Sequence, residues 1–431
     1  MRVLVRGGKP PHVPVSPEAS LSRWGWGIFG GNVGNTLFLE SVYRAVNVPE
    51  AKVEADSLYV ELLKDPEPVA DAINNDFDMY VLPLANAFRR GFIQSLRRLT
   101  EVIRRLEIPV VVPGVGGQSK LGESMSDPEV DEATRDFVNA VLDRSASIGV
   151  RGEQTAQYLQ ELGFPSSSID IIGCPSLFNH DGLHIERRIR RLQRTSRIAL
   201  NITPVTGIEP LVKYHVDRYR NLTYIPQEHQ ELGMLLWGVD ADSSRPLLPL
   251  NTRHQMYLRD QIRFFLDPQR WREFMRTQHF VFGTRIHGTI AGLTVGTPSV
   301  LIAHDSRTKE LADYHRIPHR AYSGEVPDAA ELYDTVDFSD FNNFHSESFR
   351  RYTDFLDRNS VEHIHQEGRS NPGYLERLEQ TRFPEAVRSY AAEMTPFERE
   401  LLRKLAHLRQ GATVDSSRWI GGYMPSWRPT E

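Results

Sequence analysis

The chain has 431 residues, 40% hydrophobic and 25% charged, a balance that is typical of globular proteins. Lysine and arginine total 51 against 56 aspartate and glutamate, and this charge of −5 argues against the broadly basic surface of a nucleic-acid-binding protein. The single cysteine, Cys174, excludes an internal disulfide and a metal site built from several cysteines, and it is typical of a reducing compartment. No apolar run approaches the roughly 20 residues that span a bilayer, and no signal-peptide pattern opens the chain, so we expect a soluble, cytoplasmic protein.

Short runs rich in Val and Ile alternate with helical patterns through the first half of the chain. Strands are predicted at 3–6, 79–83, 109–113, 146–151 and 169–172, and helices at 36–46, 92–106, 127–143 and 154–162. Strands that alternate with helices form a parallel sheet with helices on both faces, and strands buried on both faces are almost continuously apolar. This half therefore predicts an N-terminal α/β domain, which we place at residues 1–185.

The same alternation returns after an arginine-rich stretch, 187–197, which is interpreted as a solvated linker. Strands are predicted at 197–202, 223–226, 279–283 and 299–303, and helices at 228–237, 251–266 and 268–277. A second α/β domain is thus expected over residues 186–335. Two Rossmann-like domains facing each other across a cleft would form a glycosyltransferase-B-like architecture.

Residues 336–431 are expected to form a mostly helical C-terminal extension with an irregular tail. Helical patterns are predicted over 385–410, and 411–431 is rich in Gly, Pro, Ser and Trp. Thr395 and Glu398 flank a proline as in a capping box, so a helix is expected to start there.

The glycine-rich stretch 24–35 leads directly into the helix predicted at 36–46. Glycines let a backbone approach a ligand closely, and a helix N-terminus offers unpaired N–H groups to an anion. Asn32, Gly34 and Asn35 are therefore candidate ligand contacts, with Asn35 also able to cap the helix. A tight turn with a capped helix explains the pattern equally well, and the sequence leaves both interpretations open.

Two arginines stand where a predicted strand gives way to a helix. Arg285 and His287 follow the apolar run 280–283 and precede a helix of small residues near Gly288, and Arg151 ends the strand at 146–151. In open α/β sheets, ligands bind at the carboxyl ends of the strands. Arginine offers a bidentate fork to phosphate or carboxylate, and histidine can transfer a proton. An arginine–carboxylate pair with a core histidine is the alternative explanation.

Other polar residues receive weaker interpretations. Gln227 follows the strand at 223–226 and is expected to face the cleft, where it could contact a substrate. His315 and His319 have a metal-ligand spacing, but Pro318 between them argues against a shared helical face, so they are interpreted as a surface loop and no metal is expected. Cys174 is interpreted as a small buried residue rather than a nucleophile.

Four of these segments, in this order, resemble the polysaccharide pyruvyl transferase family. Thr284-Arg285-Ile286-His287-Gly288, followed by Gly296-Thr297-Pro298, is similar to that family's (S/T)-R-x-H-G…G-x-P motif. The stretch 303–309 resembles its basic segment, the strand ending in Arg151 its other recurrent arginine, and 31–35 its G-N-x-G-D. Asn35 stands where the family has aspartate, and Cys174 stands where the family often has an aspartate before proline.

The resemblance implies a ketal-forming transferase that acts on a surface polysaccharide or its precursor. Phosphoenolpyruvate would be the donor, with no other cofactor, and the acceptor would be a sugar or a lipid-linked oligosaccharide, through which the protein could associate peripherally with a membrane. Arg151 and Arg285 would hold phosphate and carboxylate, with His287 as a phosphate ligand or general acid and with Gly288 beside them. Lys309 or Arg307 would add a third cation.

Two other functions remain compatible with the sequence. A glycosyltransferase that uses a nucleotide sugar would be stabilised by the nucleotide diphosphate instead of phosphoenolpyruvate. A non-catalytic binding protein on the same fold, which the Asn35 and Cys174 departures keep open, would release no phosphate from any donor. The acceptor sugar, the stereochemistry of the ketal and the oligomeric state are left open.

Overall fold

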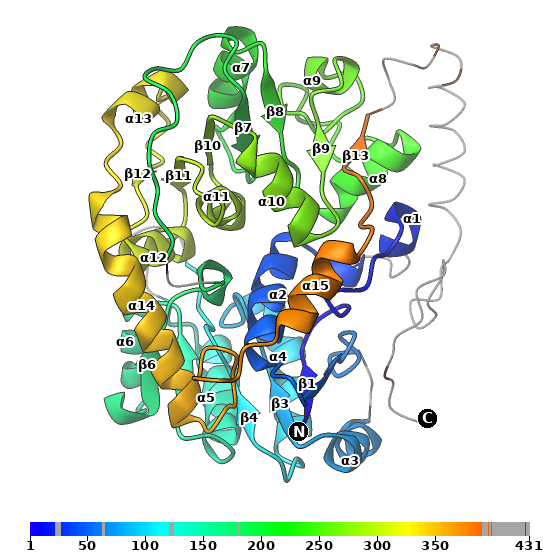
Figure 1. Ribbon diagram of the computed structural model, residues 1–431, viewed down its shortest axis with the longest axis vertical. Coiled ribbons are helices and arrows are strands. Elements are labelled where there is room, and N and C mark those ends of the chain that lie inside the picture. The colour runs from blue at the N-terminus through cyan, green and yellow to red at the C-terminus, as the bar shows by residue number, and fades with distance from the viewer. Residues whose placement is uncertain are drawn as a thin grey trace.

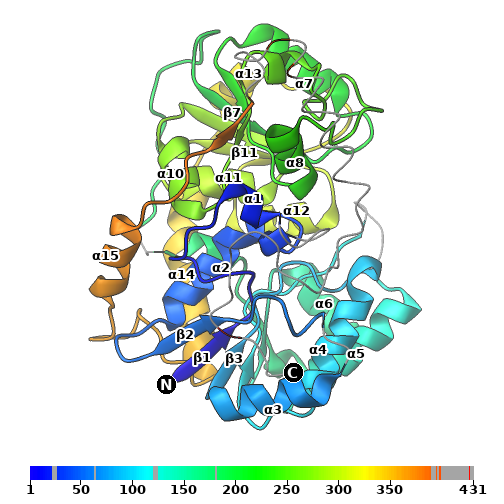
Figure 2. The same ribbon diagram turned by 90° about the vertical axis from the view of Figure 1, so that its right-hand side faces the viewer.

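The computed structural model describes residues 1–21, 27–62, 65–119, 125–179 and 182–389, together with Thr395, Glu398 and Trp427. Within these residues the chain forms two lobes, each built on parallel strands (Figures 1 and 2). No helix in the described part is both long and apolar enough to cross a membrane.

The first lobe is built on a parallel sheet in the order β2-β1-β3-β4, which is extended by a parallel pair, β5-β6. A bridge between Val115 and Val150 connects the pair to the segment that follows β4. The strands are β1 (Arg2–Val5), β2 (Lys52–Ala55), β3 (Met79–Val81), β4 (Val110–Val111), β5 (Ile148–Val150) and β6 (Ile169–Ile171). The helices are α1 (Pro17–Ser20), α2 (Gly34–Val46), α3 (Pro66–Asp76), α4 (Ile93–Ile103), α5 (Pro128–Leu142) and α6 (Glu153–Glu161), with 3-10 turns at Gly27–Phe29, Arg90–Phe92, Ser166–Ser168 and Pro175–Leu177.

The second lobe is a five-stranded parallel sheet in the order β12-β11-β10-β7-β8. Its strands are β7 (Ile198–Asn201), β8 (Leu222–Tyr224), β10 (Phe280–Gly283), β11 (Ser299–Ala303) and β12 (His319–Ala321). Its helices are α7 (Glu209–Arg218), α8 (His229–Trp237), α9 (Gln255–Leu258), α10 (Pro268–Arg276), α11 (Ile286–Leu293), α12 (Ser306–His315) and α13 (Ala329–Thr335). The α/β, glycosyltransferase-B-like fold class expected from the alternating pattern is confirmed.

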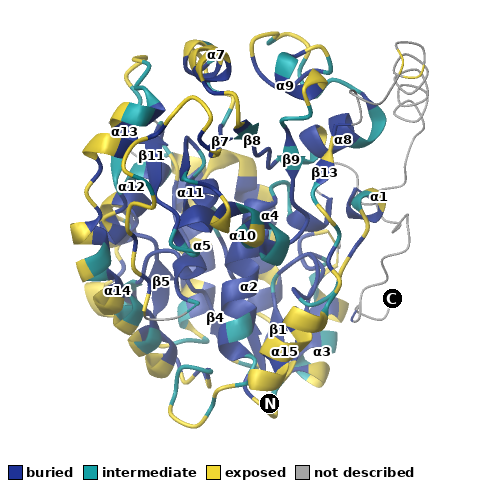
Figure 3. Ribbon diagram, turned by 45° about the horizontal axis from the view of Figure 1, so that its top comes forward, coloured by how far each residue is buried: buried dark blue, intermediate teal, exposed yellow. Residues whose placement is uncertain are grey.

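Helices α2 and α11 lie between the two sheets and bring the lobes together (Figure 2). One apolar core runs from β1 and α2 through the second sheet, while a separate core lies between the first sheet and α3, α4 and α5. Figure 3 shows the buried elements at the centre and the exposed outer faces of α14 and α15. The N-termini of α2 and α11 are thereby held close together, at the carboxyl ends of the strands.

The segment that follows α13 returns to the first lobe. Helix α14 (Ser339–Arg358) runs alongside both lobes in Figure 1, and Asn359 at its end accepts a hydrogen bond from the backbone N–H of Ser147 at 3.1 Å. Helix α15 (Pro372–Gln380) packs its Tyr374 ring against Tyr43 of α2. Both helices lie within 336–431, the stretch expected to be mostly helical, although no bounds were predicted for either of them. The division of the chain at residues 185 and 335 stays a proposal, and the two sheets lie on either side of the first boundary.

One predicted helix is wrong, and another prediction falls largely outside the described residues. In place of a helix over 251–266 there is the single turn α9, then Asp260 in the left-handed region (φ 54°), then β9 (Arg263–Phe264). Strand β9 pairs antiparallel with β13 (Val387–Arg388), a distant partner that a local pattern cannot reveal. Of the extension predicted as helical over 385–410, Thr395 and Glu398 exchange the hydrogen bonds of a capping box, and nearly all the other residues lie outside the described part.

Candidate functional site

The junction between β10 and α11 fixes Arg285 and His287. Arg285 is the N-cap residue of α11, and His287 lies in its first turn. Asn201, at the end of β7, accepts a hydrogen bond from the backbone N–H of Arg285 at 3.0 Å. A Cβ atom on Gly288 would lie 2.5 Å from the Asn201 side chain, so the helix can approach β7 only with glycine at this position. Gly288 therefore contributes close packing behind the site and does not line the cavity described below.

Arg285 is a buried cation held by both the backbone and a carboxylate. Its Nε donates to the carbonyl of Ile202 at 3.0 Å, and its Nη1 lies 2.5 Å from Glu228 Oε1. Burial works against the charge, but the nearby carboxylates, Glu228 first, outweigh it and raise the pKa of Arg285. The guanidinium is thus permanently charged and oriented before any ligand arrives.

His287 is buried and neutral. Its ring packs so tightly against the start of α2 that a Cβ atom on Gly34 would lie 2.7 Å from Nδ1. Burial, reinforced by the positive charges of Arg151, Arg307 and Arg285, holds the pKa of His287 well below its usual value. An imidazole in this state can accept a proton, and it becomes a proton donor only after an anion has compensated the surrounding charge.

Arg151 reaches the same place from the first lobe. It follows β5, its Nε donates to the carbonyl of Gly114 at 2.8 Å, and its guanidinium lies over the Phe38 ring at 5.3 Å. Its Nη2 is 3.9 Å from the Sγ of Cys174, which is itself 3.9 Å from His287 Nε2. In the described part of the chain no carboxylate forms an ion pair with Arg151, and burial lowers its pKa.

The loop before α2 meets the second lobe directly. Asn32 accepts a hydrogen bond from the backbone N–H of Gly34 at 2.7 Å and donates to Glu228 at 3.0 Å. Asn35 does not cap the helix as expected, because α2 already begins at Gly34, and its side chain donates to the carbonyl of Phe29 instead. Gln227 is buried, and its Nε2 has no partner among the described residues.

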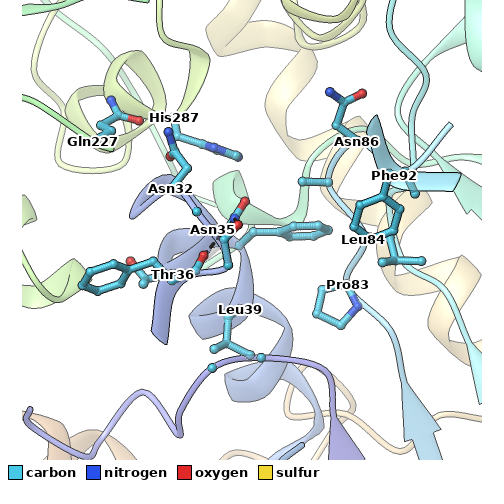
Figure 4. A pocket seen from close by; sticks show the side chains of 18 of the residues that line it. Asn32, Asn35, Thr36, Leu39, Pro83, Leu84, Asn86, Phe92, Gln227 and His287 are labelled. Carbon is cyan, nitrogen blue, oxygen red and sulfur yellow. Dashed lines mark hydrogen bonds between the residues drawn. The ribbon is translucent and has the colours of Figure 1, made fainter. Parts of the chain in front are cut away.

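These groups surround one cavity of about 450 Å³ between the lobes. Its lining includes the predicted residues Asn32, Asn35, Arg151, Gln227, Arg285, His287 and Arg307. Figure 4 shows Gln227, Asn32 and His287 on one side of the cavity and Asn86, Leu84, Phe92 and Pro83 on the other. Five arginines line it against a single carboxylate, Glu228, among the described residues, so the cavity is strongly cationic. Such a site is suited to a small, multiply charged anion.

Three predicted residues do not line the cavity. Gly34 and Gly288 act through the close packing described above. Lys309 is wrong as a cation of this site: on the outer side of α12 it pairs with Asp313 at 2.5 Å, and both side chains are exposed. Arg307, two residues earlier, lies on a different face of the helix and does line the cavity, and the sequence alone could not show which face meets the cavity.

Some residues that line the cavity were not predicted. Arg6 directly follows β1, and Asn86 and Arg89 lie in the loop after β3. The signal that identified Arg151 and Arg285, a polar residue after a buried strand, also applied to these positions. Gln118 carried the same signal, because it follows the apolar run predicted as a strand at 109–113.

The prediction that His315 lies in a surface loop is wrong, because His315 is buried in α12. Its Nε2 accepts a hydrogen bond from the backbone N–H of Cys174 at 2.7 Å, so it supports the loop beneath Arg151 and His287. Cys174 is fully buried, as predicted. In the part of the chain that the structure describes, no three His, Cys, Asp or Glu side chains are grouped as a metal site requires.

Comparison with solved structures finds distant likenesses. The UDP-GlcNAc 2-epimerase from Neisseria meningitidis bound to UDP-GlcNAc is 12% identical, with 93% of this chain and 100% of that chain covered and a TM-score of 0.41. Anabaena HepE in complex with UDP and glucose is 13% identical, with coverages of 84% and 97% and a TM-score of 0.41. The Methanocaldococcus jannaschii UDP-GlcNAc 2-epimerase is 10% identical, with coverages of 83% and 99% and a TM-score of 0.46.

Comparison with curated proteins finds no significant match. Comparison with protein families gives a match over residues 32–306, which include the segments that carry the family resemblance except residue 31 and residues 307–309. The matched family is described as polysaccharide pyruvyl transferase, and the chain belongs to it.

Proposed function

We propose that the protein transfers the pyruvyl group of phosphoenolpyruvate to two hydroxyls of a sugar, forming a ketal and releasing phosphate. The observation that carries the proposal is the convergence of Arg151 from the first lobe with Arg285 and His287 from the second on one cationic cavity. The donor carries a phosphate and a carboxylate, and several fixed cations are needed to hold both.

Arg151 is the best candidate for a direct ligand of the donor. Its Nε is used by Gly114, and in the described part of the chain no carboxylate forms an ion pair with it, while the nearby Glu310 favours its charge through space. Arg285 is already paired with Glu228, so its N–H groups would be divided between that carboxylate and the donor. The two arginines come from different lobes, and a donor bound by both would bridge the lobes.

Because His287 is neutral, the donor would have to bind before His287 can act as an acid. In the empty site the imidazole carries no extra proton, because burial and three guanidinium groups oppose one. A bound, nearly trianionic donor would reverse the local field and raise the pKa of His287, so that it could then protonate the methylene carbon. One sugar hydroxyl would add to the resulting cationic carbon, and a second would displace phosphate. Of the two hydroxyl protons, one returns to His287, which gave its own proton to the methylene carbon. The other leaves with phosphate.

The acceptor would be a sugar of a surface polysaccharide or of its lipid-linked precursor, and in the second case the protein would work at a membrane surface. Family membership supports a polysaccharide acceptor, and Gln227 would be available to it through its unpartnered Nε2. The cavity, which is about 450 Å³, is large enough for a donor together with a sugar ring.

Thermal unfolding with phosphoenolpyruvate and with UDP-glucose tests the proposal. At about one hundred times its Kd, a ligand stabilises a protein by about 2.7 kcal/mol, which gives a measurable rise in Tm. Wild type should respond to phosphoenolpyruvate, while Arg285→Ala and Arg151→Ala should not, and circular dichroism is the check that both variants are folded. Arg320→Ala is a matched control, because Arg320 is exposed, pairs with Glu331 and lies outside the cavity.

The other functions predict different results. A response to UDP-glucose alone would favour a glycosyltransferase, and the absence of phosphate release with any donor and sugar would favour a binding protein. If Arg151→Ala and Arg285→Ala respond to phosphoenolpyruvate like wild type, the assignment of the donor site is wrong. Arg151→Ala is the more decisive of the two, because it leaves no carboxylate unpaired.

A further inference from the structure

Two further arginines from different lobes line the cavity. Arg89 lies in the loop after β3, and Arg307 lies in the first turn of α12. Arg89 is at the exposed edge of the cavity, whereas Arg307 is partly buried. Desolvation lowers the pKa of Arg89, the charge of Arg307 lowers it further, and the carboxylate of Glu228 opposes both without reversing the direction. The two guanidinium groups are therefore near enough to repel each other.

Among the described residues Arg89 forms no ion pair, and Arg307 forms a long one with Asp305. The only side-chain bond of Arg89 among the described residues runs from Nε to the carbonyl of Asn86 at 2.9 Å, and its guanidinium lies 6.0 Å from the Phe92 ring centre. Arg307 approaches Asp305 only at 3.4 Å, and its Nε is buried without a partner. Charge-assisted hydrogen bonds are typically 2.7–2.9 Å long, so both arginines keep donors for a further anion.

Neutral polar and apolar groups stand beside this pair. Asn86 donates to Gln118 at 2.6 Å, and its own Oδ1 is shielded from solvent and has no partner in the described part. An amide oxygen accepts hydrogen bonds from hydroxyl groups. Leu84 and Phe92 form an apolar surface next to Asn86 (Figure 4). Hydroxyl-accepting amides next to an apolar ring suit a sugar, whose ring has polar edges and apolar faces.

We propose that Arg89 and Arg307 together bind an anionic group, a phosphate or a carboxylate, on the acceptor sugar. This assignment rests on the proposed function, in which Arg151, Arg285 and His287 are occupied by the donor. An acceptor anion between Arg89 and Arg307 would use their unmatched donors and remove the repulsion between the lobes. A neutral sugar would leave two unscreened cations beside the bound donor. The protein therefore acts on an acidic or phosphorylated sugar in preference to a neutral one.

Calorimetric titration of inorganic phosphate into protein saturated with phosphoenolpyruvate tests this site. Wild type should bind phosphate under these conditions, and Arg89→Gln should bind it at least about tenfold more weakly, which corresponds to the loss of a charge-assisted hydrogen bond. Arg90→Gln is the matched control, because the next residue pairs with Asp127 at 2.5 Å and does not line the cavity. Equal binding by Arg89→Gln and wild type, or no binding by saturated wild type, would overturn the proposal.

Three further probes separate the chemical sources. The affinities for glucuronate and for glucose 1-phosphate are compared with the affinity for glucose. The charged sugar that binds more tightly shows whether the acceptor carries a carboxylate or a phosphate. If neither binds better than glucose, the acceptor site does not select for charge and the inference fails. A protein that ignores phosphoenolpyruvate, yet binds phosphate in an Arg89-dependent way, refutes the proposed donor and retains this anion site. A normal response to phosphoenolpyruvate in Arg89→Gln, with unchanged phosphate binding, refutes this site and retains the donor.

Discussion

Lowering the pH below 6.5 is expected to destabilise the protein, because buried histidines, His215 and His315 among them, are held in their neutral form. His215 Nδ1 donates to the carbonyl of Leu211 at 2.7 Å, and its Nε2 accepts the backbone N–H of Ala329 at 3.1 Å. His315 Nε2 accepts the backbone N–H of Cys174 at 2.7 Å. A proton on either Nε2 would break its hydrogen bond, because the backbone N–H group that donates to it would then face a second donor. Burial lowers the pKa of His215 to about 4 and that of His315 to about 3.

The sign follows from which state binds the proton first. The folded pKa of each histidine lies below its unfolded value of 6.5, so below pH 6.5 the unfolded chain takes up protons that the folded protein refuses. The stability that each neutral histidine contributes is complete above pH 6.5 and is lost as the pH falls towards 4 or 3. One pH unit below the unfolded pKa, the loss is about 1.4 kcal/mol for each group. His215 and His315 should thus cost about 3 kcal/mol between pH 7.5 and 5.5.

Urea unfolding at pH 7.5 and at pH 5.5 measures this difference. In His315→Gln, the amide oxygen can still accept the Cys174 N–H but does not titrate, so the loss between the two pH values should shrink by about 1.4 kcal/mol. His184→Gln is the control, because it removes an exposed imidazole. If His315→Gln loses as much stability as wild type between the two pH values, the neutral hydrogen-bonded imidazole is not the cause.

Two further substitutions test how the site is held. Gly34→Ala would place a methyl group 2.7 Å from His287 Nδ1, so affinity for phosphoenolpyruvate should fall by about tenfold or more. Gly182→Ala is the control, because Gly182 has open space around it and the variant should bind like wild type. Equal affinities of the two variants would contradict the close packing. Glu310→Ala would remove a buried carboxylate that accepts hydrogen bonds from Thr155 N at 2.6 Å and from its Oγ1 at 2.9 Å, and it should lower the free energy of unfolding by about 3 kcal/mol, as measured in urea.

The fold was predictable where hydrophobic patterns were long and their partners were near in sequence. The run 299–303 is β11 residue for residue, and 79–83 contains β3, because both are buried on two faces and read as unbroken apolar runs. β9 was missed because its two residues pair with β13 more than a hundred residues later. Helix α14 has an apolar face, but its position beside both lobes depends on bonds such as Arg358 with Asp170, which no sequence window contains.

The site was predictable from one rule, that polar residues after buried strands gather at one edge of a parallel sheet. The rule identified Arg151, Arg285 and His287, which line one cavity. It could not separate Arg307 from Lys309, because the two lie on different faces of α12 and the packing of that helix decides which face meets the cavity. It also could not reveal that the pKa of His287 is lowered, since this depends on burial between the lobes and on three guanidinium groups from three separate segments.

Contacts that need no ligand bring the cations of the two lobes together. Ser119 exchanges backbone and side-chain hydrogen bonds with Ser306 at the start of α12, and Asn32 donates to Glu228 beside Arg285. Such contacts hold like charges near one another, so part of the folding free energy opposes electrostatic repulsion in the empty cavity. An anion that enters a site of this kind meets donors that are already oriented, and it also relieves the repulsion. The stabilisation on binding should therefore exceed that of the new hydrogen bonds alone, and it should decrease as salt screens the cavity.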